Sequence, residues 1–252
     1  MTDLKKALFD IQRVHLSGII YMVVYLVCAI FMSIGNGPSG NLCCMSDIVL
    51  DSTYKNMIIL APFAVIVMIM YYSSDFRTSV ILRYEGVGEF VSHIWKKAFV
   101  FAGVLSVLQC ILVCVAGTPF GIQTNWGNPN SYICTMYGVI MKKAVPTWQV
   151  ITTVWVSMFM ELFLLQEGLC VTWLIFETPV VGLTISIILV ALESSLRNGF
   201  SVFFTKVGIE IGGYVTGIIN IFELVAYTIV VGMVLTILMM WVAKKKDYYK
   251  VV

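Results

Sequence analysis

Two glutamates lie within one long apolar stretch of this chain, and carboxylates in such a stretch are the first side chains to consider for chemistry. Glu161 and Glu167 are the only Asp, Glu, Lys or Arg residues between Pro146 and Phe176. At 100° per residue they point about 120° apart on a helix, so they do not form one acidic stripe. We therefore expect Glu161 to face a partner helix or a water-filled cavity, with a proton site as the alternative.

Three cysteines lie between the apolar stretches and could form a disulfide. Cys43 and Cys44 precede the second stretch, and Cys134 lies between the third and the fourth. Both segments are expected outside the cell, where disulfides persist. A bridge from Cys43 or Cys44 to Cys134 is one expectation, and three free thiols are the other.

Motifs for enzyme chemistry are absent from the sequence. It has no phosphate-binding G-x-x-x-x-G-K-[ST], no H-E-x-x-H, no G-x-S-x-G and no C-x-x-C. Its two histidines, His15 and His93, stand alone beside basic segments, where a structural role is more common than metal binding. We expect no catalytic residue, no metal site and no cofactor in this chain.

The composition indicates a membrane protein. Hydrophobic residues make up 60% of the 252 and charged residues 12%, whereas soluble domains carry about 25% charged residues. The mean hydropathy is +0.93. A net charge of +2 is too small to indicate a nucleic-acid partner.

Apolar runs of about 20 residues predict membrane-spanning helices. We expect an all-α membrane protein that forms a single transmembrane domain over residues 1–252, with six spans. The predicted spans are 16–33, 57–72, 98–116, 146–176, 179–193 and 224–242. Tyr71 and Tyr72 close the second span and are expected in the aromatic belt at the membrane surface.

The distribution of positive charge predicts the orientation. With the amino terminus in the cytosol, most of the 16 Lys and Arg residues lie on the cytosolic side. The predicted external segments hold Lys55, Lys142, Lys143, Arg197 and Lys206. We therefore expect both termini in the cytosol and Glu167 nearer the cytosolic surface than Glu161.

The segment between the fifth and sixth spans, Ser194–Glu223, is too polar to cross the membrane and too apolar for an ordinary loop. Gly208 with Gly212, and Gly213 with Gly217, have the spacing that lets helices pack closely. We expect a re-entrant or surface-lying helix pair on the outer face. A glycine-rich loop is the alternative.

A charged strip from Asp75 to Lys97 separates the second and third predicted spans, with the sequence DFRTSVILRYEGVGEFVSHIWKK. This strip resembles the coupling-helix stretch of ABC-type-2 permeases, the membrane subunits of ABC exporters. The six spans, the amphipathic amino-terminal segment and the external helical insertion are also similar to the layout of that family. The likeness covers the whole chain in layout and about twenty residues in motif.

The resemblance implies a transport subunit in a plasma membrane that docks a cytosolic ABC ATPase, which would bind ATP and Mg²⁺. The absence of an N-x-[ST] sequon favours a bacterial source. It also implies a second permease, either a copy of this chain or a relative, and membrane lipid as surroundings. The substrate class implied is an amphipathic peptide, an antibiotic or a lipid, in export or in self-protection.

A helix in the strip would have one apolar edge with polar side chains beside it, which suits a protein contact. The residues expected at the ATPase contact are Asp75, Phe76, Arg77, Val80, Ile81 and Arg83. The alternative is that the strip lies on anionic lipid.

Two other classes of function are compatible with the sequence. A secondary transporter would use Glu161 as a proton site and would follow a pH gradient without an ATPase. A non-transporting immunity or sensor protein would bind partners without ATP-dependent flux.

Overall fold

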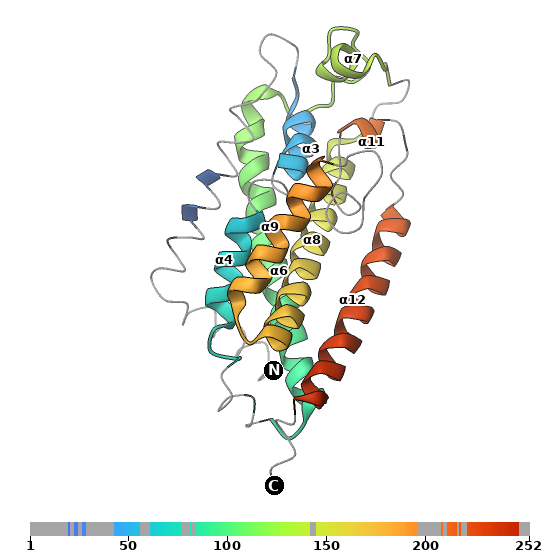
Figure 1. Cartoon of the computed structure of the whole chain (residues 1–252). Helices are drawn as coiled ribbons and strands as arrows, with labels where there is room; N and C mark the ends of the chain where they lie inside the picture. The colour runs from blue at the N-terminus through green and yellow to red at the C-terminus, as the bar shows by residue number, and fades with distance from the viewer. Residues whose placement is uncertain are drawn as a thin grey trace.

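The computed structural model of the chain is all-α and describes residues 43–55, 61–76, 84–141, 145–195 and 221–246, with short pieces at 20, 23–24, 27–28, 81, 208, 211–215 and 217. The predicted first span, 16–33, and the amphipathic amino-terminal segment lie outside the described residues apart from those short pieces. Figure 1 shows the described helices as one elongated bundle.

Three helices are long and apolar enough to cross a membrane, which indicates a multi-pass membrane protein. They are α6 (Val87–Gly117), α8 (Thr147–Phe176) and α12 (Ile221–Lys245). The 30 residues of α8 reach about 45 Å, more than the roughly 30 Å of hydrocarbon in a bilayer. Two shorter apolar helices accompany them, α4 (Ala61–Tyr72) and α9 (Pro179–Ser195). The predicted helices at 146–176, 179–193 and 224–242 agree with α8, α9 and α12 to within three residues.

The third helix begins earlier than predicted. The sequence interpretation has a separate coupling helix followed by a span from Ala98, but α6 is continuous from Val87. No proline interrupts this stretch, and its glycines are tolerated inside a helix at a cost of about 1 kcal/mol each. The second half of the charged strip is therefore the first part of a long apolar helix.

The two ends of the bundle are described separately below and are given names here. The lysine-rich end is where α4 ends at Tyr72, α6 begins at Val87 and α12 ends at Lys245. The capped end is the opposite one, where α3 (Met45–Lys55), α7 (Tyr132–Tyr137) and α11 (Ile211–Val215) lie at the top of Figure 1. These two names are used for the ends below.

The sequence interpretation missed two helices of the capped end, α3 and α7, because their residues lie in segments that are predicted to be external loops. Ile48, Val49 and Leu50 of α3 are buried against α6 and α8. The hydroxyl groups of Ser52 and Thr53 donate to carbonyls three residues earlier in the same helix, at 2.7 and 2.6 Å. These bonds satisfy the polar side chains, so α3 can be buried although its sequence is not strongly apolar.

Only part of the predicted external helix pair is described. α9 continues to Ser195, and α11 is a short helix whose Tyr214 packs edge-on against Trp126, with ring centroids 5.8 Å apart. Arg197 and Lys206, which are expected on the outer side, lie outside the described residues.

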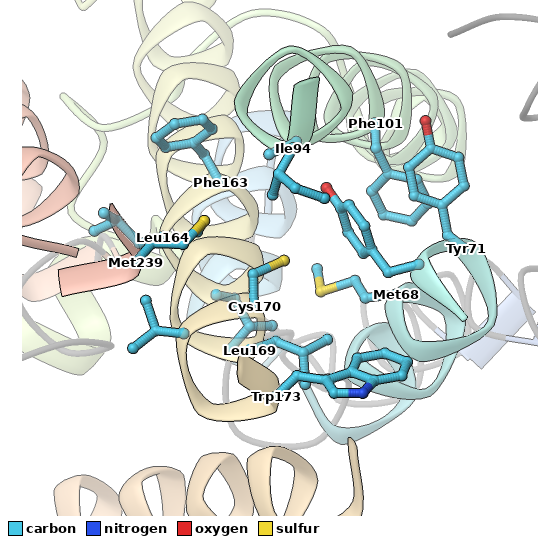
Figure 2. Packing of buried hydrophobic residues seen from close by; sticks show 14 of the residues in the cluster. Met68, Tyr71, Ile94, Phe101, Phe163, Leu164, Leu169, Cys170, Trp173 and Met239 are labelled. Atoms are coloured by element: carbon cyan, nitrogen blue, oxygen red, sulfur yellow. The ribbon is translucent and has the colours of Figure 1, made fainter. Parts of the chain in front are cut away.

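The main core lies between α4, α6, α8 and α12, towards the lysine-rich end. Figure 2 shows Met68 and Tyr71 of α4 facing Ile94 and Phe101 of α6, with Cys170 and Trp173 of α8 beside them. Tyr71 and Tyr72 are 4% and 0% exposed, so the prediction that they lie in the aromatic belt at the membrane surface is wrong. The Tyr72 hydroxyl has a polar partner inside the bundle, Gln166, as described below.

A two-residue connection joins α8 to α9 at the lysine-rich end. Glu177 has a φ of 58°, the left-handed conformation that usually favours glycine after a helix, and its N–H donates to the Trp173 carbonyl at 2.8 Å. α9 then begins at Pro179, a residue well suited to the first turn of a helix. The two helices are antiparallel neighbours.

Candidate functional site

A buried cluster of polar side chains lies inside the bundle near the lysine-rich end. It is built from the last turn of α4, the turn at 73–76, the first turns of α6 and the second half of α8. Its members are Tyr71, Tyr72, Asp75, His93, Lys97, Gln166 and Glu167. We refer to these seven residues as the polar cluster.

The centre of the polar cluster is an ion pair between Lys97 and Asp75. Lys97 Nζ donates to Asp75 Oδ2 at 2.6 Å, and the Lys97 residue is only 2% exposed. Nζ also donates to the Tyr71 carbonyl at 3.4 Å and lies 4.2 Å from the centroid of the Tyr71 ring. The pair joins two positions 22 residues apart and fixes the turn after α4 onto α6.

Asp75 remains ionised because of its neighbours. Burial alone would raise the pKa of this carboxyl group, but His93 and the positive charge of Lys97 outweigh burial, and the pKa is below its usual value. His93 Nε2 lies 3.7 Å from Asp75 Oδ1. Desolvating a buried pair of this kind costs several kcal/mol. Removing one partner destabilises the fold by about 3–5 kcal/mol, because it leaves the other charge buried alone.

A second set of bonds connects the cluster to α8. The Tyr72 hydroxyl donates to Gln166 Oε1 at 3.0 Å, and Gln166 Nε2 donates to the carbonyls of Ala98 at 3.2 Å and Leu162 at 3.1 Å. Gln166 is completely buried, so these bonds satisfy its amide. Through this one side chain α4, α6 and α8 are held together.

Glu167, the next residue, differs from its neighbours. It is completely buried, and neither carboxyl oxygen has a hydrogen-bond partner among the residues that the structure describes. Glu161, the other glutamate of α8, is half-buried and lies outside the polar cluster. The structure therefore separates the two glutamates by environment as well as by direction.

Three of the residues expected at an ATPase contact are directed into the protein. Asp75 is in the ion pair, Ile81 is 2% exposed, and the Phe76 ring stacks on Trp173 with centroids 4.7 Å apart and planes at 10°. The Phe76 ring of the apolar edge predicted for docking is thus turned towards α6 and α8, where Phe90 and Trp173 pack against it. Arg77, Val80 and Arg83 lie outside the described residues.

The exposed side of the same region is polar. Glu85, Glu89, Ser92 and Lys96 are exposed at the start of α6, at positions that share one side of the helix from Glu89 onward. Glu89 Oε2 accepts from the Glu85 N–H at 2.8 Å, which joins the first turn of α6 to the residue before its N-cap, Gly86.

The cysteines predicted to be external, Cys43, Cys44 and Cys134, lie around the capped end and are free thiols in the structure. Burial, followed by the charge of Asp47, raises the pKa of Cys43 above its usual range and that of Cys44 to about 11. A raised pKa favours the thiol over the thiolate, which is the nucleophilic form. Cys134 is half-buried on α7.

An apolar groove between α6, α8 and α12 has a volume of about 510 Å³. Trp95, Phe99 and Phe163 line one side of it and methionines of α12 the other. The hydroxyls of Thr228 and Thr236 donate to carbonyls of their own helix at 2.9 and 2.8 Å. The groove can accept hydrocarbon but offers no free polar group for chemistry.

Sequence reasoning missed the role of Lys97 and Gln166. In the sequence, Lys97 is interpreted, like Lys96, as a charge that sets the orientation of the protein in the membrane. It follows the buried Ile94 by three residues and precedes the buried Phe101 by four. That spacing places Lys97 on the inner face of a helix, and it could have indicated that the side chain is buried. Gln166 has the same kind of signal, because it is an uncharged polar residue that follows two leucines in a mostly apolar helix.

The polar cluster can hold helices together and can hold a proton, but it has no arrangement for catalysis by a metal. Within the described part of the chain, no three His, Cys, Asp or Glu side chains lie where they could bind one ion. Comparisons with protein-family models, with curated proteins and with solved structures each find no match to this chain.

Proposed function

We propose that this chain is the membrane-spanning permease subunit of an ATP-binding cassette exporter. A separate cytosolic subunit would hydrolyse ATP, and the chain would move an amphipathic peptide, antibiotic or lipid outward. In this proposal the chain has six spans in a plasma membrane, both termini are cytosolic, and the lysine-rich end faces the cytosol. A second permease, a copy or a relative, completes the pathway.

The observation that carries the proposal is the attachment of the charged strip to the helix bundle. The Lys97–Asp75 pair at 2.6 Å fixes the start of the strip to α6, and the stack of Phe76 on Trp173 fixes it to α8. Buried packed contacts of this kind transmit displacement rather than absorb it. A partner that pushes on the strip would therefore move α4, α6 and α8 as one body.

The proposed ATPase contact combines exposed and inward-facing residues with different tasks. Glu89, Ser92 and Lys96 form the exposed face at the start of α6, and Arg77 and Arg83 are proposed beside them. Asp75, Phe76 and Ile81 would not touch the ATPase directly but would hold that face in place. We assign these two tasks because Asp75 and Ile81 are buried, whereas the residues of the exposed face are open to a partner.

Two features support a membrane pathway for a partly apolar substrate. α12 exposes Phe222, Met233 and Trp241 among other large apolar side chains, and a surface of that kind is compatible with lipid or another apolar helix. The groove of about 510 Å³ beside it is lined almost wholly by apolar side chains. The substrate class remains part of the proposal.

The test is copurification of the chain with a nucleotide-binding subunit, identified by mass spectrometry, followed by transport in proteoliposomes. We expect no ATP hydrolysis by the chain alone and ATP-dependent export by the complex. Arg77→Glu should uncouple hydrolysis from export without disturbing the fold, and Lys142→Glu, on the predicted outer side, is the matched control. ATP turnover by the pure chain, or export without an ATPase, would contradict the proposal.

A secondary transporter is the second candidate, favoured by the half-buried Glu161 inside a membrane helix. It predicts flux that follows a pH gradient without ATP and is lost in Glu161→Gln. A partner complex that shows no flux under either condition would instead indicate an immunity or sensor protein.

A further inference from the structure

We propose that Glu167 is a proton-binding site: its carboxyl group is a neutral acid while α4 packs against α8, and it ionises when these helices separate. The ligand is a proton exchanged with water. This inference goes beyond the proposed transport function. It is argued from the burial and the contacts of one side chain.

The first argument is burial without a partner. Glu167 has no exposed surface, and neither of its oxygens accepts or donates a hydrogen bond among the described residues. An isolated carboxylate in such surroundings is far less favourable than a neutral acid, because burial removes the water that stabilises its charge. The neutral acid is therefore the form that this packing accommodates.

Asp75 shows what an ionised carboxylate requires in the same cluster. It has Lys97 at 2.6 Å and His93 at 3.7 Å, so two basic side chains face it. Among the described residues Glu167 has no such neighbour, because Lys97 is already engaged by Asp75. The cluster thus contains one compensated carboxylate and one uncompensated carboxyl group.

Within the described part of the chain, the helices packed around Glu167 bring no further charge to it. The titratable groups that interact with it are Tyr72 of α4 and Cys170, one turn further along α8. The described side chains of α9 up to Leu192 are uncharged, and so is α12 from Leu224 to Ala243. α6 contributes His93 and Lys97, both directed at Asp75.

Opening of the α4–α8 contact would change this state. The Tyr72 hydroxyl bonded to Gln166 closes the contact beside Glu167. When that bond breaks and water enters, the O–H bond of Glu167 can break, the proton passes to water, and the carboxylate is hydrated. On closure the carboxylate must take a proton back from water before it is buried again.

The experiment is infrared spectroscopy of the purified chain in lipid vesicles at neutral pH, with no ATPase present. We expect a carboxylic-acid carbonyl band that is lost in Glu167→Gln and retained in Glu161→Gln, the matched control. Glutamine has nearly the same shape as the neutral acid, so Glu167→Gln should keep the melting temperature of the wild type, which also verifies the fold. Identical carboxylic-acid bands in the wild type and Glu167→Gln would overturn the proposal.

Deuterium exchange tests the opening. The acid band shifts when its proton is replaced, and we expect this shift to be several-fold faster in Tyr72→Phe, which lacks the bond to Gln166. Equal exchange rates in Tyr72→Phe and the wild type would overturn the proposed opening. Because the ATPase is absent from both measurements, failure of the exporter proposal would leave these results unchanged.

Discussion

Each end of the bundle buries one described aspartate, and the two sets of surroundings shift the pKa of its carboxyl group in opposite directions. At the lysine-rich end Asp75 faces Lys97 and His93, and its pKa is lowered although burial would raise it. At the capped end Asp47 accepts from Trp126 Nε1 at 2.8 Å and from the Cys44 N–H at 2.9 Å, and its pKa is raised, because burial outweighs these neutral donors. Asp47 is 1% exposed and Asp75 6% exposed, so burial alone does not decide the direction.

The difference shows how each end is held together. A charged pair fixes the lysine-rich end, so loss of one partner leaves a buried charge behind. The capped end is an apolar cluster around Trp126 in which Asp47 bonds to the indole and caps the start of α3. Loss of a donor there leaves one unpaired oxygen, which costs less.

The largest expected effect comes from Lys97→Met. It leaves the Asp75 carboxylate buried without its main cation, and we expect the free energy of unfolding to fall by about 3–5 kcal/mol. Lys96→Met, at the exposed neighbouring position, is the control and should change it by less than about 0.5 kcal/mol. Denaturant titration in detergent, followed by circular dichroism, measures both.

The double variant Lys97→Met with Asp75→Asn sharpens this result. It removes the stranded charge, so part of the lost stability should return. Equal stabilities of the two lysine variants would mean that the pair does not hold the lysine-rich end.

Trp126→Phe should have a smaller effect at the capped end. It removes the donor to Asp47 Oδ1, and we expect a loss of about 1–3 kcal/mol in the free energy of unfolding. Trp148→Phe is the matched control, since that ring is 69% exposed and its replacement should be nearly neutral. A loss as large as that of Lys97→Met would refute the distinction between the two ends.

The smallest expected effect is the dependence of stability on pH, which should have opposite signs at the two ends. The lowered pKa of Asp75 stabilises the fold above the usual value of 3.8, and this contribution is lost as the pH falls through the folded-state pKa. The raised pKa of Asp47 works in the other direction: stability is full below 3.8 and declines as the pH rises through the folded-state pKa.

Melting temperatures measured over a pH series would separate the two contributions. Asp75→Asn should remove the loss on acidification, and Asp47→Asn should remove the decline as the pH rises. Parallel curves for the two variants would mean that the aspartates do not differ in this way.

The long helices could be predicted from the sequence because hydrophobic runs report burial in lipid or protein directly. Between Thr147 and Phe176 only two residues are charged, and the predicted and observed bounds of α8 differ by one residue at the start. α3 could not be predicted in this way. Its burial depends on the bonds of Ser52, Thr53 and Asp47, which a hydropathy profile records only as polarity.

The candidate site was predicted only in part for a related reason. Asp75 and Phe76 were singled out from the charged strip, but charge and apolar spacing do not tell whether a residue faces a partner protein or its own bundle. The partners that turn them inward, Lys97 and Trp173, lie 22 and 97 positions further along the chain. Contacts at that separation are fixed by tertiary packing, not by local pattern.

The two-residue connection at Glu177 has a consequence for how the protein enters the membrane during its synthesis. A linker this short cannot cross a bilayer, so in the proposed six-span arrangement α8 and α9 would insert as a helical hairpin with their joined ends on one side. Charges added near Glu177 would then reorient both helices or neither.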